Sequence, residues 1–336
     1  MKKATALALT LGVTIVALAA MQDGRLGAQT DDSNAAPNPY REDVGWAKTA
    51  LGRPHGSTIG IEADRDGKSI WVLDRCGGNT CYQSKIAPIL KFDPAGKLVA
   101  AIGAGLMNAP HGFHIDRDGN VWVADGNGPQ GRGHAVYKLS PDGKVLMTLG
   151  KPNSAGAGDD EFNAPSDVVT APNGDIFVAD GHGEKTNARI MKFSKDGKFI
   201  KTWGKEGKGP GEFNQPHGIA MDSQGRLFVA DRANSRIQIF DQDGKFLTEW
   251  KQFGRPSGVV IDKNDVIHVA DSQSTAQNNP GFQQGIRVGS AKDGKVTAFI
   301  PETVLLGALE TVGFDDAGNV YAGYTNKMDF KRWVKK

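Results

Sequence analysis

Two histidines occupy equivalent places in a repeated sequence and are the residues best suited to bind a metal. His111 stands in Asn-Ala-Pro-His-Gly, and His217 stands in Asn-Gln-Pro-His-Gly. Each lies eight residues before the glycine of a predicted turn, and Glu310 takes the same place in the last copy of the repeat. Two imidazoles and a carboxylate with an open coordination position are the ligand pattern of a catalytic divalent-metal site. The alternative is that Pro-His-Gly is a structural turn in which the histidine only forms hydrogen bonds.

The same column of the repeat holds other polar residues. Ser166 and Ser257 occupy it in the third and fifth copies, and His55 lies four residues before it in the first copy. These three side chains are predicted to contact a bound substrate. Three histidines fall outside the column and are interpreted as structural: His114, His134 and His268.

A second column follows the aspartate that ends the next predicted strand. Arg75 and Arg232 occupy it in the first and fourth copies, and His182 comes one residue after it in the third copy. In a meander the first strand begins, and the second ends, at the same face, so the two columns share a face. The two arginines are then placed to flank an anionic or carbonyl group over the metal. The alternative for each arginine is an ion pair with the preceding aspartate, Asp74 or Asp231.

Both columns belong to one unit that is repeated six times. Four copies align closely, at residues 108–125, 163–180, 214–231 and 254–271. Two more divergent copies lie at residues 59–74 and 307–323. Each copy has alternating apolar residues around a tight turn, and a second hairpin follows, which predicts a four-stranded antiparallel meander. Six such meanders predict an all-β fold, a six-bladed β-propeller.

The propeller explains how distant residues would meet. Alternate blades of a six-bladed ring lie about 120° apart, so His111, His217 and Glu310 should converge on the central axis. The last blade has room for only three strands before the chain ends. Residues 44–52 resemble the fourth strands of other blades, such as residues 199–204, and are predicted to complete it. Pairing the two chain ends in one blade would remove two open sheet edges.

The N-terminus predicts export. Two lysines precede an uncharged apolar stretch, residues 4–20, and small residues follow. This pattern is typical of a secretory signal peptide within residues 1–29, cleaved between 20 and 29. An uncleaved anchor helix is the alternative. Residues 30–43 are polar and predicted to be a flexible lead-in, so the propeller would occupy residues 44–336 of a periplasmic or secreted protein with no membrane span.

Cys76 and Cys81 are the only cysteines of the chain. In an oxidising compartment two nearby cysteines usually pair, so we expect a disulfide. A metal-binding cysteine pair is the other interpretation, but the sequence has no second pair to complete such a site.

Charge and composition exclude several classes of protein. The 336 residues are 39% hydrophobic and 23% charged, which is typical of a folded globular protein. Forty basic residues face 38 acidic ones, and without Lys2 and Lys3 of the signal segment the two counts are equal. No basic run marks a nucleic-acid-binding face, so no nucleic-acid partner is expected.

The repeats resemble NHL repeats, most clearly in Val-Ala-Asp-Arg-Ala-Asn-Ser-Arg-Ile-Gln-Ile-Phe at residues 229–240. Nearly the whole mature chain further resembles the catalytic domain of peptidyl-α-hydroxyglycine α-amidating lyases. That family is a six-bladed propeller whose zinc is held by three histidines from Pro-His motifs on alternate blades. His111 and His217 match two of these histidines, and Glu310 stands at the place of the third.

The resemblance also implies roles for residues near the metal. Arg232 matches an arginine of the family's active site, and Arg75 matches the other. His182 stands where the family has its catalytic tyrosine, which makes it the proton acceptor. The family's structural calcium is bound by an aspartate directly after the third histidine. Because Thr311 stands there in this chain, the resemblance does not extend to calcium.

The activity implied is that of an exported lyase with zinc or another divalent metal. It would cleave a small peptide-like N-acyl carbinolamine, such as a peptidyl-α-hydroxyglycine, into an amide and glyoxylate. The exchanges of tyrosine for histidine and of histidine for glutamate leave a metal-dependent hydrolase as an alternative. A non-catalytic propeller that binds a peptide, a glycan or a protein partner is the alternative from another class, because fold does not fix function.

Overall fold

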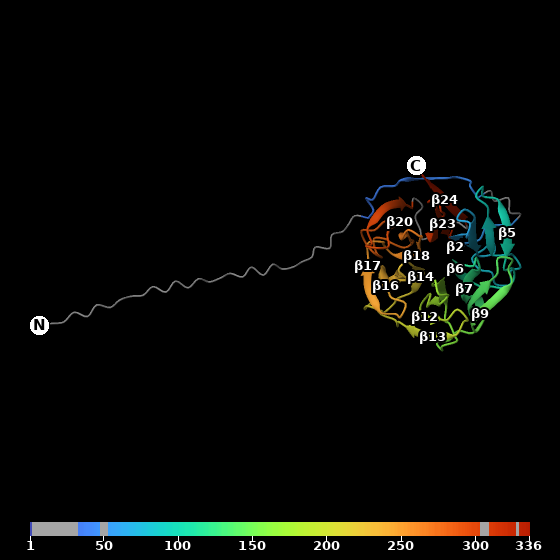
Figure 1. Cartoon of the computed structure of the whole chain (residues 1–336), viewed down its shortest axis with the longest axis horizontal. Coiled ribbons are helices and arrows are strands. Elements are labelled where there is room, and N and C mark those ends of the chain that lie inside the picture. The colour runs from blue at the N-terminus through green and yellow to red at the C-terminus, as the bar shows by residue number, and fades with distance from the viewer. Residues whose placement is uncertain (2–32, 48–52, 303–308, 327–328) are drawn as a thin grey trace. The chain divides into compact units, whose positions relative to one another are not determined.

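Six four-stranded sheets form a ring around a central axis in the computed structural model (Figure 1). The structure describes Met1 and residues 33–47, 53–302, 309–326 and 329–336. Apart from Met1, the predicted signal peptide therefore lies outside the described residues. The all-β, six-bladed propeller that the repeats predict is confirmed.

Each blade is an antiparallel meander whose first strand lies nearest the axis (Figure 1). Blade 1 comprises β2 (Thr58–Ala63), β3 (Ile70–Asp74), β4 (Ile89–Phe92) and β5 (Leu98–Ile102). Blade 2 comprises β6 (Pro110–Ile115), β7 (Val121–Gly128), β8 (Arg132–Leu139) and β9 (Val145–Gly150). Blade 3 comprises β10 (Pro165–Thr170), β11 (Ile176–Asp180), β12 (Arg189–Phe193) and β13 (Phe199–Trp203).

The second half of the ring repeats this plan. Blade 4 comprises β14 (Pro216–Met221), β15 (Leu227–Asp231), β16 (Arg236–Phe240) and β17 (Phe246–Trp250). Blade 5 comprises β18 (Pro256–Ile261), β19 (Val266–Asp271), β20 (Gly285–Ser290) and β21 (Val296–Pro301). Blade 6 comprises β22 (Leu309–Phe314), β23 (Val320–Tyr324), β24 (Asp329–Lys335) and β1 (Tyr40–Glu42).

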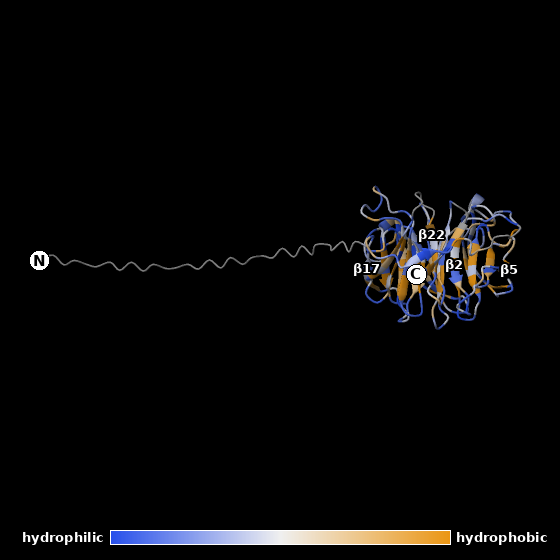
Figure 2. Cartoon of the chain, turned by 90° about the horizontal axis from the view of Figure 1, so that it is seen from above, coloured by the Kyte–Doolittle hydropathy of each residue, from blue (hydrophilic) through white to orange (hydrophobic). Residues whose placement is uncertain are grey.

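Burial differs between the middle and the outer strands of a blade. Every residue of β11 and of β15 is buried, because neighbouring blades cover both faces of these strands. The outer strand β13 alternates between exposed and half-buried residues, as a strand at the rim of the ring should. Apolar residues accordingly fill the strands between the hydrophilic loops of the two faces (Figure 2).

The N-terminal segment closes the last blade, as predicted, but with a different strand. Tyr40 pairs with Lys335 and Glu42 pairs with Trp333, so β1 is the outermost strand of blade 6. The predicted strand at residues 44–52 is wrong for its described part, 44–47, which forms no strand; residues 48–52 lie outside the described residues. Trp46 instead packs its ring against the aromatic residues of blades 1 and 6, with centroid distances of 5.2–6.3 Å: Phe92, Tyr321 and Phe330.

The segment expected to be a flexible lead-in is also attached to the propeller from Ser33 onward. The Oγ atom of Ser33 is buried and accepts a hydrogen bond of 2.9 Å from Nε of Arg287. Arg287 is itself fully buried in blade 5, where its guanidinium pairs with Asp271 at 3.2 Å. The polar composition of the segment therefore indicates hydrogen bonding to a buried cation and not disorder.

Within the described residues, no helix has the length and apolar character needed to cross a membrane. Cys76 and Cys81 form a disulfide, which confirms that prediction.

Candidate metal centre

Four potential metal ligands converge where the inner strands begin. His111 lies on β6, His217 on β14 and Glu310 on β22, in blades 2, 4 and 6, and His182 follows β11 of blade 3. One ligand atom from each residue lies within 4.8 Å of those of the other three. The structure thus brings together the three predicted ligands and adds His182 to them. We call these four residues the ligand cluster.

A bulge and a glycine place each histidine. The pairing of β6 with β7 shifts register between Pro110 and Gly112, and the corresponding shifts occur in the inner strands of blades 4 and 6. Such bulges re-aim a side chain at the end of a strand. A Cβ atom on Gly112 would lie 2.3 Å from the Cα atom of Asp167 in the next blade, so the position requires glycine. The sequence Pro-His-Gly thereby aims an imidazole at the axis.

The neighbouring blade fixes the orientation of both Pro-His imidazoles. Nδ1 of His111 lies 2.8 Å from the backbone oxygen of Ser166, and Nδ1 of His217 lies 3.1 Å from that of Ser257. A carbonyl oxygen can only accept, so each Nδ1 carries the proton and donates it. Each Nε2 therefore bears a lone pair, which is the arrangement that metal-binding histidines adopt.

Those lone pairs point at a carboxylate. Nε2 of His217 lies 3.1 Å from Oε1 of Glu310, and Nε2 of His111 lies 3.5 Å from the same oxygen. Neither Nε2 has a hydrogen-bond partner among the described residues. Two lone pairs and a carboxylate oxygen repel one another unless a cation or a proton lies between them.

Electrostatics favour a cation over a proton. Burial, together with the positive charge of Arg232, lowers the pKa of His217 to about 3, so its ring is neutral at pH 7. Burial alone would raise the pKa of Glu310, but the positive charge around it, that of Arg232 included, holds it well below the usual range. A buried anion beside a neutral imidazole fits a divalent ion, and the mixed nitrogen and oxygen ligands suit zinc.

Arg232 borders the cluster on the side of His182. It begins a short 3₁₀ turn, Arg232–Asn234, directly after β15. Its Nη2 atom donates to Nε2 of His182 at 3.1 Å and to Oε1 of Gln215 at 2.9 Å. The alternative of an ion pair with Asp231 does not occur, because Asp231 pairs with Arg236 at 2.8 Å. The sequence had not singled out Gln215, and only its place two residues before His217 could have suggested it.

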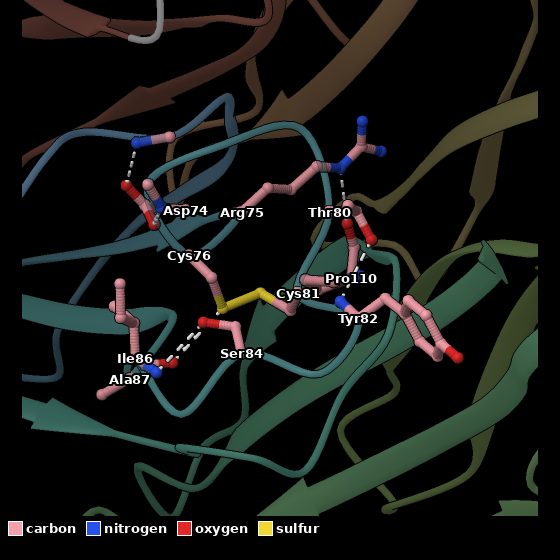
Figure 3. Close-up of a disulfide and its surroundings, with 12 residues drawn as sticks. Asp74, Arg75, Cys76, Thr80, Cys81, Tyr82, Ser84, Ile86, Ala87 and Pro110 are labelled. Atoms are coloured by element: carbon pink, nitrogen blue, oxygen red, sulfur yellow. Dashed lines mark hydrogen bonds between the residues drawn. A yellow bond between two sulfur atoms is a disulfide. The ribbon is translucent and has the colours of Figure 1, made fainter. Parts of the chain in front are cut away.

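Arg75 approaches from blade 1 on the loop that the disulfide closes (Figure 3). Its Nε donates to the backbone oxygen of Pro110 at 3.1 Å, and its Nη1 donates to Oδ1 of Asn79 at 2.9 Å. Asp74 instead forms an ion pair with Arg53. Arg75 and Arg232 both interact electrostatically with Glu310, so both place positive charge near the cluster.

The three predicted substrate-binding side chains are placed differently. The Oγ atom of Ser166 donates to the backbone oxygen of Pro216 at 2.6 Å, and the Oγ atom of Ser257 bonds to that of Ser272. The backbone oxygens of both serines, and not their hydroxyls, bond to the histidines of the cluster. An inspection of side-chain types cannot detect such a role. His55 lies outside the ligand cluster and packs against Phe330, with ring centroids 5.9 Å apart.

A cavity of about 480 Å³ follows the axis from the ligand cluster toward the opposite ends of the inner strands. At those opposite ends the cavity is lined by a second polar group, which we call the relay: Glu62, His114 and Thr170. Nδ1 of His114 lies 3.2 Å from Oε1 of Glu62, and its Nε2 lies 2.9 Å from Oγ1 of Thr170. Arg75, Arg232 and His182 do not line this cavity, so they border the cluster from its other side.

Comparisons with known proteins agree with this architecture. Residues 213–240 match the family model described as NHL repeat. The chain is a six-bladed β-propeller with an NHL repeat. The propeller resembles a solved gluconolactonase from Xanthomonas campestris, with a TM-score of 0.59, 16% identity and coverage of 84% of this chain and 87% of that one. A streptogramin B lyase structure gives a TM-score of 0.55 at 16% identity, covering 88% and 97%, and both likenesses concern the fold alone.

Three curated relatives are similar in sequence over about half of the propeller chain. Peptidyl-glycine alpha-amidating monooxygenase B of Xenopus laevis is 36% identical over 211 residues, 57% of this chain and 23% of that protein. Peptidyl-alpha-hydroxyglycine alpha-amidating lyase 1 of Drosophila melanogaster is 35% identical over 171 residues, 48% and 28%. Human NHL repeat-containing protein 3 is 35% identical over 201 residues, 57% and 54%. The chain thus matches 23% to 54% of the length of these three relatives.

Proposed function

We propose that the chain is an exported, metal-dependent lyase for peptidyl-α-hydroxyglycine-like N-acyl carbinolamines. The observation that carries the proposal is the convergence of Nε2 of His111 and Nε2 of His217 on the buried carboxylate of Glu310, with which Arg75 and Arg232 also interact electrostatically. Similarity to proteins named amidating lyases supports this substrate class. The disulfide and these relatives support export to an oxidising compartment.

His111, His217 and Glu310 would hold the metal. When bound, it supplies a Lewis acid that lowers the pKa of a coordinated substrate hydroxyl. Arg75 and Arg232 carry the positive charges needed to hold the substrate carboxylate and to stabilise negative charge that develops during the reaction. Their anchoring by Pro110, Asn79 and Gln215 fixes these charges before the substrate arrives.

His182 is the proton acceptor in this mechanism. Burial, then the neighbouring His111 and His217 and the charge of Arg232, hold the pKa of His182 well below its usual value, so the ring is neutral and can accept a proton. The hydroxyl proton passes to His182 as the carbinol C–O bond becomes a carbonyl. The C–N bond breaks, its electron pair goes to nitrogen, and that nitrogen takes up a proton. The products are an amide and glyoxylate.

The test combines metal analysis with product detection. Protein purified without a histidine tag is assayed for divalent metal and for glyoxylate released from an N-acyl-α-hydroxyglycine. We expect about one ion per chain, as for a single site, and glyoxylate release that a chelator abolishes. Metal without glyoxylate would remove the lyase and leave the second candidate, a metal-dependent hydrolase, to be tested on simple esters. That candidate is favoured by Glu310, which stands in place of a zinc-binding histidine of the lyase family, and by His182, which stands in place of its catalytic tyrosine.

A further inference from the structure

We infer that His182 is a fourth metal ligand and that Arg232 competes with the metal for its lone pair. The inference rests on the proposed metal centre and concerns a residue to which we gave only the role of proton acceptor. If it is right, the site has two states, with three or with four protein ligands, and Arg232 selects between them.

The first argument is distance. The ring centroid of His182 lies 4.4 Å from that of His111 and 4.9 Å from that of His217. The centroids of His111 and His217 are themselves 4.7 Å apart. His182 is therefore closer to His111 than His217 is, and only 0.2 Å farther from His217 than His111 is. Three imidazoles and the Glu310 carboxylate give the four donors that zinc usually takes when its coordination is closed.

The second argument is the number of lone pairs. A neutral imidazole has one nitrogen with a proton and one with a lone pair. In this structure Nε2 of His182 accepts from Nη2 of Arg232 at 3.1 Å, so the proton is on Nδ1 and no second lone pair remains. A metal would need either Nε2, which displaces Arg232, or a deprotonated Nδ1, which moves the proton to Nε2. In both cases His182 cannot bind the metal and accept from Arg232 at once.

The consequence is a coupling with a definite sign. Arg232 has a second acceptor, Oε1 of Gln215, and therefore keeps a partner when it releases His182. A substrate carboxylate that draws Arg232 away would leave the lone pair of His182 free. Removing the guanidinium should then tighten metal binding through His182, whereas the loss of an ordinary supporting residue weakens metal binding.

The experiment measures metal affinity and coordination without any assay of turnover. Wild type, H182A, R232M and the double variant are titrated with Co²⁺, and Zn²⁺ affinity is measured by competition with a chelator. We expect H182A to weaken binding by more than the roughly 10–100-fold that loss of an outer-shell partner costs. Its visible Co²⁺ absorption should weaken as water replaces nitrogen. H114Q is the matched control, because His114 is another histidine on an inner strand but lies outside the ligand cluster, and H114Q should bind metal as wild type does.

The double variant isolates the competition. Loss of the positive charge of Arg232 alone should tighten metal binding by the same factor with or without His182. A larger gain from R232M in the wild-type background than in H182A supports competition, and equal gains overturn it. A wild-type affinity and Co²⁺ spectrum in H182A would show that His182 is not a ligand while the three-ligand site stands. Failure of the wild type to bind either metal would instead overturn the metal centre itself.

Discussion

The ligand cluster and the relay both place histidine beside glutamate, yet they differ in the partners of the imidazole nitrogens. In the relay, Nδ1 of His114 lies 3.2 Å from Oε1 of Glu62 and Nε2 lies 2.9 Å from Oγ1 of Thr170, so both ring nitrogens have a hydrogen-bonding partner. In the cluster, the backbone takes the Nδ1 proton of His111 and of His217, and each Nε2 faces a carboxylate oxygen. A histidine and a glutamate side by side therefore do not by themselves indicate a metal.

The second carboxylate oxygen of Glu62 also has a hydrogen-bond donor. Oε2 of Glu62 accepts from the backbone N–H of Ile115 at 2.9 Å, so this carboxylate satisfies an inner-strand edge of the next blade. Glu310 lies between the rings of His111 and His217, close to two arginines. The relay thus joins blades 1, 2 and 3 at their inner strands. The cluster, in contrast, concentrates lone pairs and negative charge at a single point.

The largest expected effect separates the two groups directly. H217A should lose the metal and lower lyase turnover on the order of 10³-fold or more, since a metal supplies several kcal/mol of charge stabilisation. The fold should persist, because one side chain at the axis adds little to six packed blades. Metal content, glyoxylate release and thermal melting are compared with those of H114Q, which alters the relay. Metal retained in H217A, or lost in H114Q, would contradict the distinction.

A smaller effect is expected beside the cluster. R232A should keep the ion but lower turnover by about 10²–10³-fold, as the loss of a preorganised charge at a reacting centre typically does. R226A is a suitable control, because Arg226 pairs with Asp222 away from the ligand cluster. Turnover and metal content are measured on the same preparation. Turnover close to wild type in R232A would remove the arginine from the mechanism.

The pH dependence of metal binding provides a third test. His217, with a pKa lowered to about 3, and Glu310, with a pKa well below its usual range, are already deprotonated at pH 5. Protons should compete with the metal at these two ligands only when the pH falls below their pKa values, whereas an ordinary histidine titrates near about 6.5. We expect Zn²⁺ binding, measured by chelator competition, to weaken less between pH 7 and pH 5 than it would for a site of several ordinary histidines that titrate together. Release of the ion near pH 6 would mean that these ligands are not held neutral and ionised as described.

The smallest effect concerns the relay alone. T170V keeps the shape of the side chain but removes the hydroxyl that bonds to Nε2 of His114. The free energy of unfolding should fall by about 1 kcal/mol, the usual net contribution of such a hydrogen bond. Metal affinity should not change. Chemical denaturation measures the free energy of unfolding, and chelator competition measures the metal affinity. Loss of metal in T170V would show that the relay and the ligand cluster are not independent.

The fold could be predicted from the sequence because each repeat contains the residues at which its strands end. The turn glycines and the strand-ending aspartates recur in each blade, and the propeller follows from them. The closing strand was misplaced because Tyr40–Glu42 is too short to show a pattern, whereas Trp46 made residues 44–52 look like a fourth strand. Trp46 in fact packs against aromatic residues of blade 6 without belonging to a strand.

The candidate site was predictable only in part, for a similar reason. Columns of the repeat identified His111, His217 and Glu310, because equivalent positions converge on the axis. They did not identify the backbone oxygens of Ser166 and Ser257, since any residue offers a carbonyl. Nor could they show that His182 accepts from Arg232, because that contact joins two loops of different blades.

The closure of blade 6 has a consequence for when the ring can be completed. Asp43 and Arg332, which pair where β1 meets β24, are 289 residues apart in the sequence. During synthesis Asp43 therefore emerges from the ribosome long before Arg332. The ring can become continuous only after the residues of β24 have also been synthesised. A chain interrupted anywhere before β24 would present unpaired strand edges, which invite aggregation and expose it to proteolysis.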